Sequence, residues 1–491
     1  MNTKQEKKNL LFYPLGTVGR DMVYALFTNY VMLFILYTKQ LTNQQLVFIT
    51  GIMVFARIFD ALNDPIMGFI IEKTRSKYGK FKPWLLSGIL LTSVVIYLVF
   101  NTNLEGWNFV WFFLVIYLSY SIAYTMHDIS YWGMIPALSK DGDMRNKLTA
   151  RATLFAGIGG IIAGICIPMF TAGSLALGGN AKTAYGRIAL IIAVLAPLFI
   201  LFTLFGAKED RSEMATSSER ITFRKIGSSI GGNDQLLWMI LIFLLQQIGN
   251  GIVLAGAGPN YIYFEFGYEG GLYSTFSTVG MMATGFLMIF YPAISRKLHR
   301  QRMVELMWIV GTIGYAIMLV AGLFLPSTML KFWILSVGFM AANLGQYGLY
   351  LIMMISIINT VEYNELKTGS RDEAIIASVR PFLTKMASSV TIIIATVTYM
   401  IVKVTEHTNQ ISGLEKLANQ ELITAAEKSE QIAAVISEVA PWQKNGLLLS
   451  MTVLPCALMI ISCMLYKKHY ILSEEKYDEI CKELETRKAN Q

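Results

Sequence analysis

The chain has 491 residues, of which 54% are hydrophobic and 15% are charged. Soluble proteins carry about 25% charged residues, so the composition excludes an ordinary soluble domain and indicates an all-α integral membrane protein. The net charge of +8 does not indicate nucleic-acid binding, because the basic residues gather in short loops on one side of the predicted spans.

Long apolar runs recur along the chain, and each span needs about 20 residues to cross a bilayer. An even number of spans leaves both termini on one side, and the basic loops place that side in the cytoplasm. We therefore expect a multi-pass protein of the cell membrane with both ends inside. The twelve predicted helices are 10–37, 44–71, 83–101, 108–137, 147–171, 185–206, 234–257, 270–295, 304–325, 331–361, 373–404 and 443–467.

A polar loop, 207–233, divides the spans six and six. Basic loops at matching places in the two halves, such as EKTRSKYGKFKPW and SRKLHRQRMVELMW, indicate a duplication. Repeated halves with a site between them are a transporter architecture. The predicted parts are an N-terminal bundle (1–206), a cytoplasmic middle loop (207–233), a C-terminal bundle (234–467) with an external loop of about 405–444 that forms an amphipathic helix, and a cytoplasmic tail (468–491).

The predicted helix 44–71 carries Asp60 and Asp64 on one face, with Asn63 and Arg57 beside them. An ionisable group at the bilayer centre costs roughly 2.5–3.5 kcal/mol, so these groups need a partner, a cation or a water-filled path. One interpretation is an Arg57–Asp60 ion pair that only fixes helix registry. The other is a site for Na+ or a proton, because carboxylate and amide oxygens suit a small hard cation.

Other spans of the first half also carry charge. Arg20 and Asp21 lie in the first span, about 15 Å deep at 1.5 Å per residue. Thr125, Asp128 and Trp132 share a face of the span 108–137. Acids accept hydrogen bonds from sugar hydroxyls, Arg donates in a fixed fork, and Trp offers a flat face to a sugar ring. The residues that fit polyol recognition in this way are Asp21, Asp128, Trp132 and Arg151.

The segments GRDMVYA, RIFDALNDPIMG, RSKYGKFKPW, YTMHDISYWGMIP and TVEYNELK resemble the glycoside–pentoside–hexuronide:cation symporter family (melibiose permease-like) of the major facilitator superfamily. The resemblance implies twelve transmembrane helices in two six-helix bundles. It also implies a cation-coupled sugar or glycoside symporter that works by alternating access. By this resemblance the cation binds at Asp60, Asn63, Asp64 and Thr125. The sugar binds at Arg20, Asp21, Tyr124, Asp128, Trp132 and Arg151. The coupling residues are Arg57 and Lys385, and Lys385 lies near the cation pocket.

The chain departs from the family pattern at three places. Arg20 stands where melibiose permeases have Lys, Tyr350 stands where they have Trp, and Arg380–Pro381 replaces a Gln–Thr pair. We add Tyr350 and Arg380 to the predicted sugar site. A guanidinium at position 380 favours an acidic sugar, because Arg pairs with carboxylates bidentately. The alternative is an Arg that snorkels to the inner interface, with neutral glycosides as cargo.

Three other functions compete with sugar transport. Asp141-Gly-Asp143 resembles the metal motif of glycosyltransferases, but it lies in a short loop with no domain to receive a nucleotide. A carrier of another cargo, such as a lysolipid, remains open, whereas a channel would need a symmetric ring of acids. We expect no cofactor beyond the coupling ion, no enzyme activity, and partners limited to sugar, monovalent cation and membrane lipid, with the protein a monomer.

Overall fold

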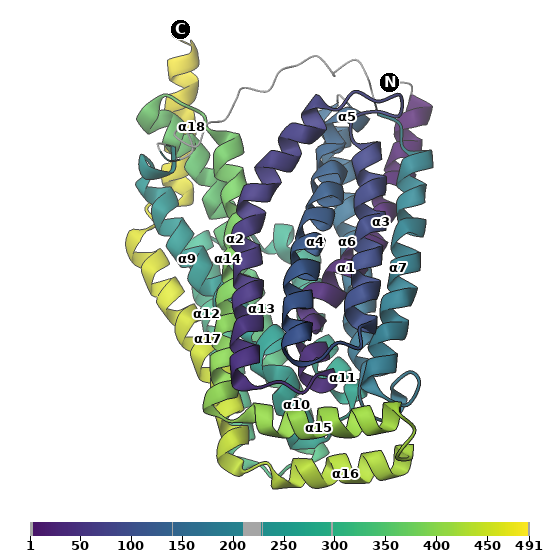
Figure 1. The fold of residues 1–491 in the computed structure, drawn as a ribbon. Helices are drawn as coiled ribbons and strands as arrows, with labels where there is room; N and C mark the ends of the chain where they lie inside the picture. Colours follow the sequence, from purple (N-terminus) through teal and green to yellow (C-terminus); the bar gives the residue numbers. More distant parts are fainter. Residues whose placement is uncertain (1–2, 140, 210–226, 228, 296–297, 490–491) are drawn as a thin grey trace. The chain divides into compact units, whose positions relative to one another are not determined.

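The computed structural model describes residues 3–139, 141–209, 227, 229–295 and 298–489, so most of the predicted middle loop 207–233 lies outside the described residues. Among the described residues every regular element is a helix (Figure 1). Eleven of these helices are long and apolar enough to cross a membrane. The element α11 (Gly270–Ser295) has the same bounds as the remaining predicted span.

Some helices of the first half begin at side-chain caps. Thr42 and Gln45 form a reciprocal capping box at the start of α2, and Asn180 accepts the amide of Thr183 at the start of α7. α1 packs on α6 and α7, α3 on α4 and α7, and α2 on α4. The elements are α1 (Thr3–Thr38), α2 (Asn43–Lys73), α3 (Lys82–Asn101), α4 (Gly106–Gly133), α5 (Ile135–Leu138), α6 (Gly142–Thr171), η1 (Gly173–Leu175) and α7 (Ala181–Gly206).

The second half contains one interrupted span and one helix that ends at a left-handed glycine. The predicted span 234–257 is interrupted by a π-helical segment, η3, in which Gly256 has φ −109° and ψ −116°. Gly369 (φ 74°) ends α13 in the left-handed conformation that glycine favours. The tail forms a helix, α18, that packs on α13. The elements are α9 (Asp234–Gly251), η3 (Ile252–Ala257), α10 (Gly258–Phe266), α11, α12 (Arg300–Phe324), α13 (Met329–Thr368), α14 (Glu373–Ile401), α17 (Pro441–His469) and α18 (Glu474–Ala489).

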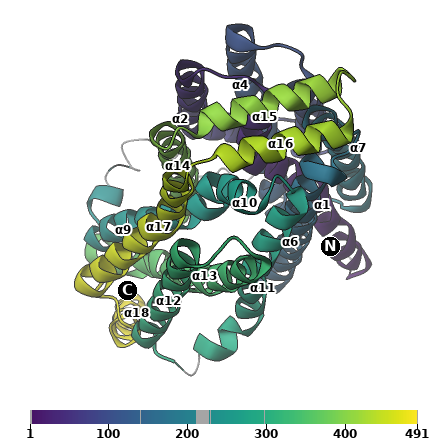
Figure 2. The ribbon, with the colours of Figure 1, turned by 90° about the horizontal axis from the view of Figure 1, so that it is seen from below.

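The segment expected as one external amphipathic helix forms a helical hairpin instead. α15 (Val404–Asn419) and α16 (Ala425–Glu438) lie side by side (Figure 2). Thr424 and Glu427 form a capping box that starts α16, so the chain turns where a second helix is signalled locally. The hairpin belongs to the compact unit of the first-half helices, together with Gly267–Ser274, while the other described second-half helices form a second unit.

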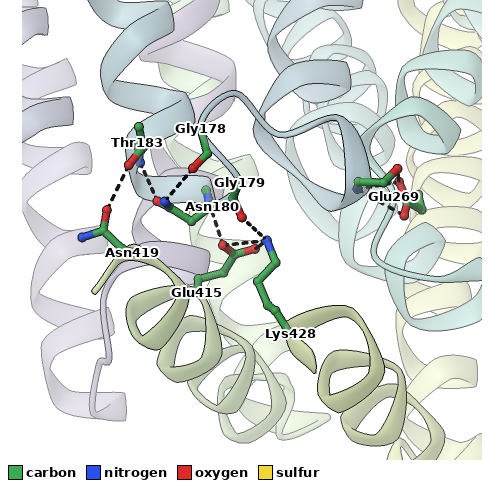
Figure 3. A network of polar contacts seen from close by, with 10 residues as sticks. Gly178, Gly179, Asn180, Thr183, Glu269, Glu415, Asn419 and Lys428 are labelled. Carbon is green, nitrogen blue, oxygen red and sulfur yellow. Dashed lines mark hydrogen bonds and ion pairs between the residues drawn. The ribbon is translucent and has the colours of Figure 1, made fainter. Parts of the chain in front are cut away.

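A buried ion pair ties the hairpin to α7 (Figure 3). The side chains of Glu415 and Lys428 are 1% and 6% exposed, and their charged atoms lie 3.4 Å apart. Glu415 accepts the amide of Ala181 at 2.7 Å, and Lys428 donates to the carbonyl of Gly179 at 2.6 Å. Burial raises the pKa of Glu415, and Lys428 opposes that rise. We call Glu415, Lys428 and these two backbone groups the hairpin anchor.

Candidate functional site

Three charged side chains of α1 and α4 form one cluster inside the first unit. Arg20 donates to Asp128 Oδ1 at 2.7 Å and lies 3.0 Å from Asp21 Oδ2. The side chain of Arg20 is 7% exposed, whereas those of Asp21 and Asp128 are 19% and 35% exposed. Arg20 therefore contacts both carboxylates, and each carboxylate keeps part of its surface exposed. We call these residues the Arg20 cluster.

Aromatic rings surround this cluster. The Arg20 guanidinium lies 5.1 Å from the ring centroid of Trp132 and 5.8 Å from that of Tyr131. Tyr124 is half-buried and lies near Tyr24, with ring centroids 5.7 Å apart. Carboxylates beside flat apolar faces match a ligand that has both hydroxyl groups and a ring, as a sugar does.

The two acids of α2 face hydroxyl groups of α4. Thr125 donates to Asp64 Oδ1 at 3.0 Å, and Ser121 donates to Asp60 Oδ1. Asp60 is buried and Asp64 is half-buried. Arg57 lies 3.6 Å from Asp60 Oδ2, so the predicted ion pair exists, but it occupies only one of the two acids. We call Asp60, Asp64, Ser121 and Thr125 the α2–α4 oxygen cluster.

Several polar atoms near the oxygen cluster lack a hydrogen-bond partner among the described residues. They include Arg57 Nε, Asn63 Nδ2 and the hydroxyls of Tyr117 and Tyr120. Buried polar groups normally have a partner in the protein or in ordered water. A solvated ion or a water-filled path along α2 would supply such partners, whereas a closed structural ion pair would not.

Not every predicted residue joins these clusters. Arg151 is exposed on α6 and donates to the carbonyl of Leu10 at 3.4 Å, ten residues before Arg20 on α1. Asp141 caps α6 by accepting the amides of Asp143 and Met144. The sequence Asp-Gly-Asp is therefore explained by a helix N-cap.

The three predicted residues of the second half lie in the second unit. Arg380 of α14 lies 3.5 Å from the hydroxyl of Tyr350 on α13 and 3.1 Å from the sulfur of Met354. Lys385 is half-buried one turn further along α14. Tyr350 and Arg380 therefore form a polar pair.

The sequence reasoning missed Ser121 of α4 and assigned no role to His127. Ser121 precedes Thr125 by four residues and so lies on the same helical face, which was the available signal. His127 is fully buried, and neither ring nitrogen has a hydrogen-bond partner among the described residues. Its ring lies against Tyr124.

The oxygen cluster presents the type of donor atom that hard monovalent cations prefer. It offers two carboxylates one helical turn apart and two hydroxyl oxygens. Among the described residues, no group of three or more His, Cys, Asp and Glu side chains is arranged for a metal ion, so hydroxyl, amide or water oxygens would complete the coordination.

Known sugar transport proteins are similar to this chain over most of its length. A family model described as MFS/sugar transport protein matches residues 12–470. Lactose permease of Lactobacillus delbrueckii subsp. bulgaricus is 29% identical over 98% of this chain and 73% of the permease. The raffinose carrier protein of Pediococcus pentosaceus is 27% identical, covering 97% and 71%, and the isoprimeverose transporter of Lactiplantibacillus pentosus is 24% identical, covering 77% of each chain.

Solved structures share the fold at low sequence identity. A bacterial homologue of the human lysosomal transporter Spinster aligns with a TM-score of 0.63 at 10% identity, over 96% of this chain and 99% of that one. A D-xylose–proton symporter aligns with a TM-score of 0.55 at 12% identity, over 89% and 98%. Identities this low carry the fold and leave the cargo open.

Proposed function

We propose that this chain, which belongs to the MFS/sugar transport protein family, is a cation-coupled glycoside symporter that works by alternating access. The family confirms the predicted resemblance, the major facilitator fold and a multi-pass transporter rather than an enzyme. The coupling ion, the cargo and the residues that bind them are the parts that we propose.

The α2–α4 oxygen cluster carries the proposal of cation coupling. Two acids at adjacent turns of α2 face the hydroxyls of Ser121 and Thr125, and Arg57 lies 3.6 Å from Asp60 Oδ2. Their four carboxylate oxygens and two hydroxyl oxygens are hard donors of the kind that a cation such as Na+ prefers. Since an isolated charge is costly inside a membrane, occupancy by Na+ or a proton favours the closed, sugar-loaded state.

The Arg20 cluster supports a sugar as the cargo. Asp21 and Asp128 are held by Arg20 with part of each carboxylate still exposed. Sugar hydroxyls can donate to those carboxylates while Trp132 and Tyr124 contact the ring faces. Relatives are named for lactose, raffinose and isoprimeverose, which are neutral glycosides, so we propose a neutral di- or oligosaccharide as the main cargo.

Residues of α4 connect the two clusters. Thr125 belongs to the oxygen cluster, and Asp128 lies three residues later on the same helix. A cation that fixes α4 against α2 therefore presents Asp128 to the sugar. By linkage, the cation raises sugar affinity and the sugar raises cation affinity by the same factor.

Transport in reconstituted vesicles tests the proposal. Purified protein in proteoliposomes should accumulate labelled lactose or raffinose above the external concentration when a Na+ gradient or a pH gradient is imposed separately. One of the two gradients should drive accumulation, and a dissipated gradient should leave only equilibration. Equilibration alone under both gradients would contradict cation coupling, and no uptake of any glycoside would contradict the cargo.

The orientation of the chain is also proposed. The basic stretch from the end of α2 to the start of α3 contains Lys73, Arg75, Lys77, Lys80 and Lys82, and such stretches remain in the cytoplasm. With an even number of spans both termini are then cytoplasmic, in the cell membrane, and α15 and α16 are external. A monomer remains the expected state.

A further inference from the structure

A groove of about 910 Å³ lies between the start of α1, the start of α3 and the end of α7 in the first unit. Its inner wall forms because α1 and α7 approach closely at Gly206. A side-chain carbon at Gly206 would lie 2.2 Å from Cγ of Phe12, so only glycine allows Phe12 to lie against the end of α7. The groove is distinct from both charge clusters described above.

The long wall of the groove is apolar. Leu195, Leu198, Phe202 and Phe205 line it at helical spacing along α7, and the last three are exposed. At 1.5 Å per residue, this row is about 15 Å long. That length equals one leaflet of a hydrocarbon core about 30 Å thick, and α7 is one of the membrane-spanning helices. The length and the apolar character of this wall therefore fit a lipid acyl chain.

Positive charge gathers at the end of the groove where α7 ends. Lys8, Lys82 and Lys208 are among its lining residues, and that lining contains no Asp or Glu among the described residues. Lys82 donates to the carbonyls of Leu204 and Ala207 at 2.6 and 2.7 Å, which fixes its ammonium at the helix terminus.

The other two lysines carry exposed side chains. Lys8 extends from α1, and Lys208 follows the end of α7. The amide of Lys208 donates to Asn9 Oδ1 at 3.0 Å, which ties its backbone to α1 beside Lys8. The adjacent acid, Glu209, is buried and accepts the amide of Lys80. Burial raises the pKa of Glu209, and the nearby Lys82 ammonium opposes that rise, so Lys8 and Lys208 are the two lysines whose exposed ammonium groups are offered to a ligand.

We propose that this groove binds an anionic glycerophospholipid, with its phosphate at Lys8, Lys82 and Lys208 and an acyl chain along the α7 wall. Basic pockets between transmembrane helices favour anionic headgroups. A zwitterionic headgroup carries a cationic group of its own, which the three lysines repel, so we expect it to bind more weakly than an anionic headgroup. A soluble anion would fill the basic end and leave the apolar wall unused.

Native mass spectrometry of the full-length protein in detergent tests the site. The probe is palmitoyl-oleoyl phosphatidylglycerol, compared with phosphatidylethanolamine of the same chains and with glycerol 1-phosphate. Lys8→Gln/Lys208→Gln should bind phosphatidylglycerol about tenfold more weakly than wild type, because two of the three lysines are lost. Leu198→Trp, which fills the wall without changing charge, should also weaken binding.

The matched control is Lys7→Gln/Lys147→Gln. Both of these lysines are exposed, the charge change is the same, and neither residue lines the groove. This variant should bind phosphatidylglycerol as wild type does. Equal binding by wild type and Lys8→Gln/Lys208→Gln would overturn the proposal. Equal affinity of the wild type for phosphatidylethanolamine and phosphatidylglycerol would also overturn it. Competition by glycerol 1-phosphate, at the concentrations at which the lipid binds, would overturn it as well and would indicate a site for soluble anions.

Discussion

The hairpin anchor and the Arg20 cluster are both buried charge clusters of the first unit, but they differ in how fully their charges are satisfied. In the anchor, Glu415 and Lys428 bond to each other and to fixed backbone groups at Ala181 and Gly179. In the Arg20 cluster, Asp128 has one charged partner and a side chain that is 35% exposed. The charged side chains of the anchor are almost fully buried, whereas the Asp128 carboxylate of the Arg20 cluster keeps exposed surface.

The comparison separates charges whose bonding capacity is used within the protein from charges that keep capacity for a ligand. A buried ion pair whose remaining hydrogen-bonding capacity is used by backbone groups fixes one segment on another and has little left for a ligand. A charged group that keeps exposed surface can exchange water for a ligand. In the oxygen cluster the half-buried Asp64 fits this second description, and Asn63 Nδ2 nearby has no hydrogen-bond partner among the described residues, whereas Asp60 is buried and pairs with Arg57. Four experiments test the distinction, in order of expected effect.

Asp64→Asn should have the largest effect. The change removes one of the two carboxylates that we assign to the cation, so accumulation against a gradient should be lost while downhill exchange of sugar remains. Proteoliposome uptake and counterflow measure the two activities separately. Asp143→Asn is the control, since Asp143 is exposed in the first turn of α6 and should leave accumulation unchanged. Accumulation by Asp64→Asn at the wild-type level would remove Asp64 from the cation site.

Asp21→Ala and Asp128→Ala should each abolish measurable sugar binding. Truncating one partner of a buried charged interaction costs about 2–5 kcal/mol, which is more than tenfold in affinity. Isothermal titration with the transported glycoside measures the loss. Cation binding, followed as a rise in Tm, should remain in both variants and shows that they fold. Near-normal sugar affinity in either one would make the Arg20 cluster structural, like the anchor.

Glu415→Gln should loosen the hairpin and leave sugar affinity unchanged. The amide removes the charge beside buried Lys428, at an expected cost of about 1–3 kcal/mol. Hydrogen exchange of α15 and α16 should rise. Lys416→Gln is the matched control, because its partner Glu105 is exposed and exposed pairs contribute little.

A second variant of the anchor guards against simple misfolding. Glu415→Leu/Lys428→Met replaces both charges with apolar groups and should recover most of the protection, since apolar pairs often equal buried ion pairs in stability. Loss of sugar affinity in Glu415→Gln would contradict the contrast between the two clusters.

Arg380→Gln should have the smallest effect. If Arg380 contacts the cargo, a uronide should compete better than the matching neutral glycoside in wild type, by about 1 kcal/mol, because hydrogen bonds to charged groups are stronger. The preference should vanish in the variant, whereas neutral glycosides should compete as before. Competition assays with paired neutral and acidic sugars measure this. Equal potency in wild type identifies Arg380 as a snorkelling residue that bonds Tyr350 and Met354.

The acids of α2 illustrate what the sequence predicts well. The spacing of Asp60 and Asp64 predicts one helical face, and the structure adds the hydroxyls of Ser121 and Thr125 opposite them. Arg151 illustrates the opposite case. Its place in the family pattern assigned it to the sugar, but no spacing rule says which face of α6 it occupies, and in the structure its guanidinium bonds the carbonyl of Leu10. Whether it contacts sugar stays a prediction.

The sequence by itself determined the membrane fold, the positions of the spans and the helices that carry charge, because apolar length and the cost of a buried charge are local properties. Only the tertiary structure decided which charges meet. It joined Arg20 to Asp128 across 108 residues and attached the hairpin of α15 and α16 to α7 rather than leaving it with the second-half helices. Such pairings depend on helix packing, and side chains distant in sequence leave no periodic signal of their contact.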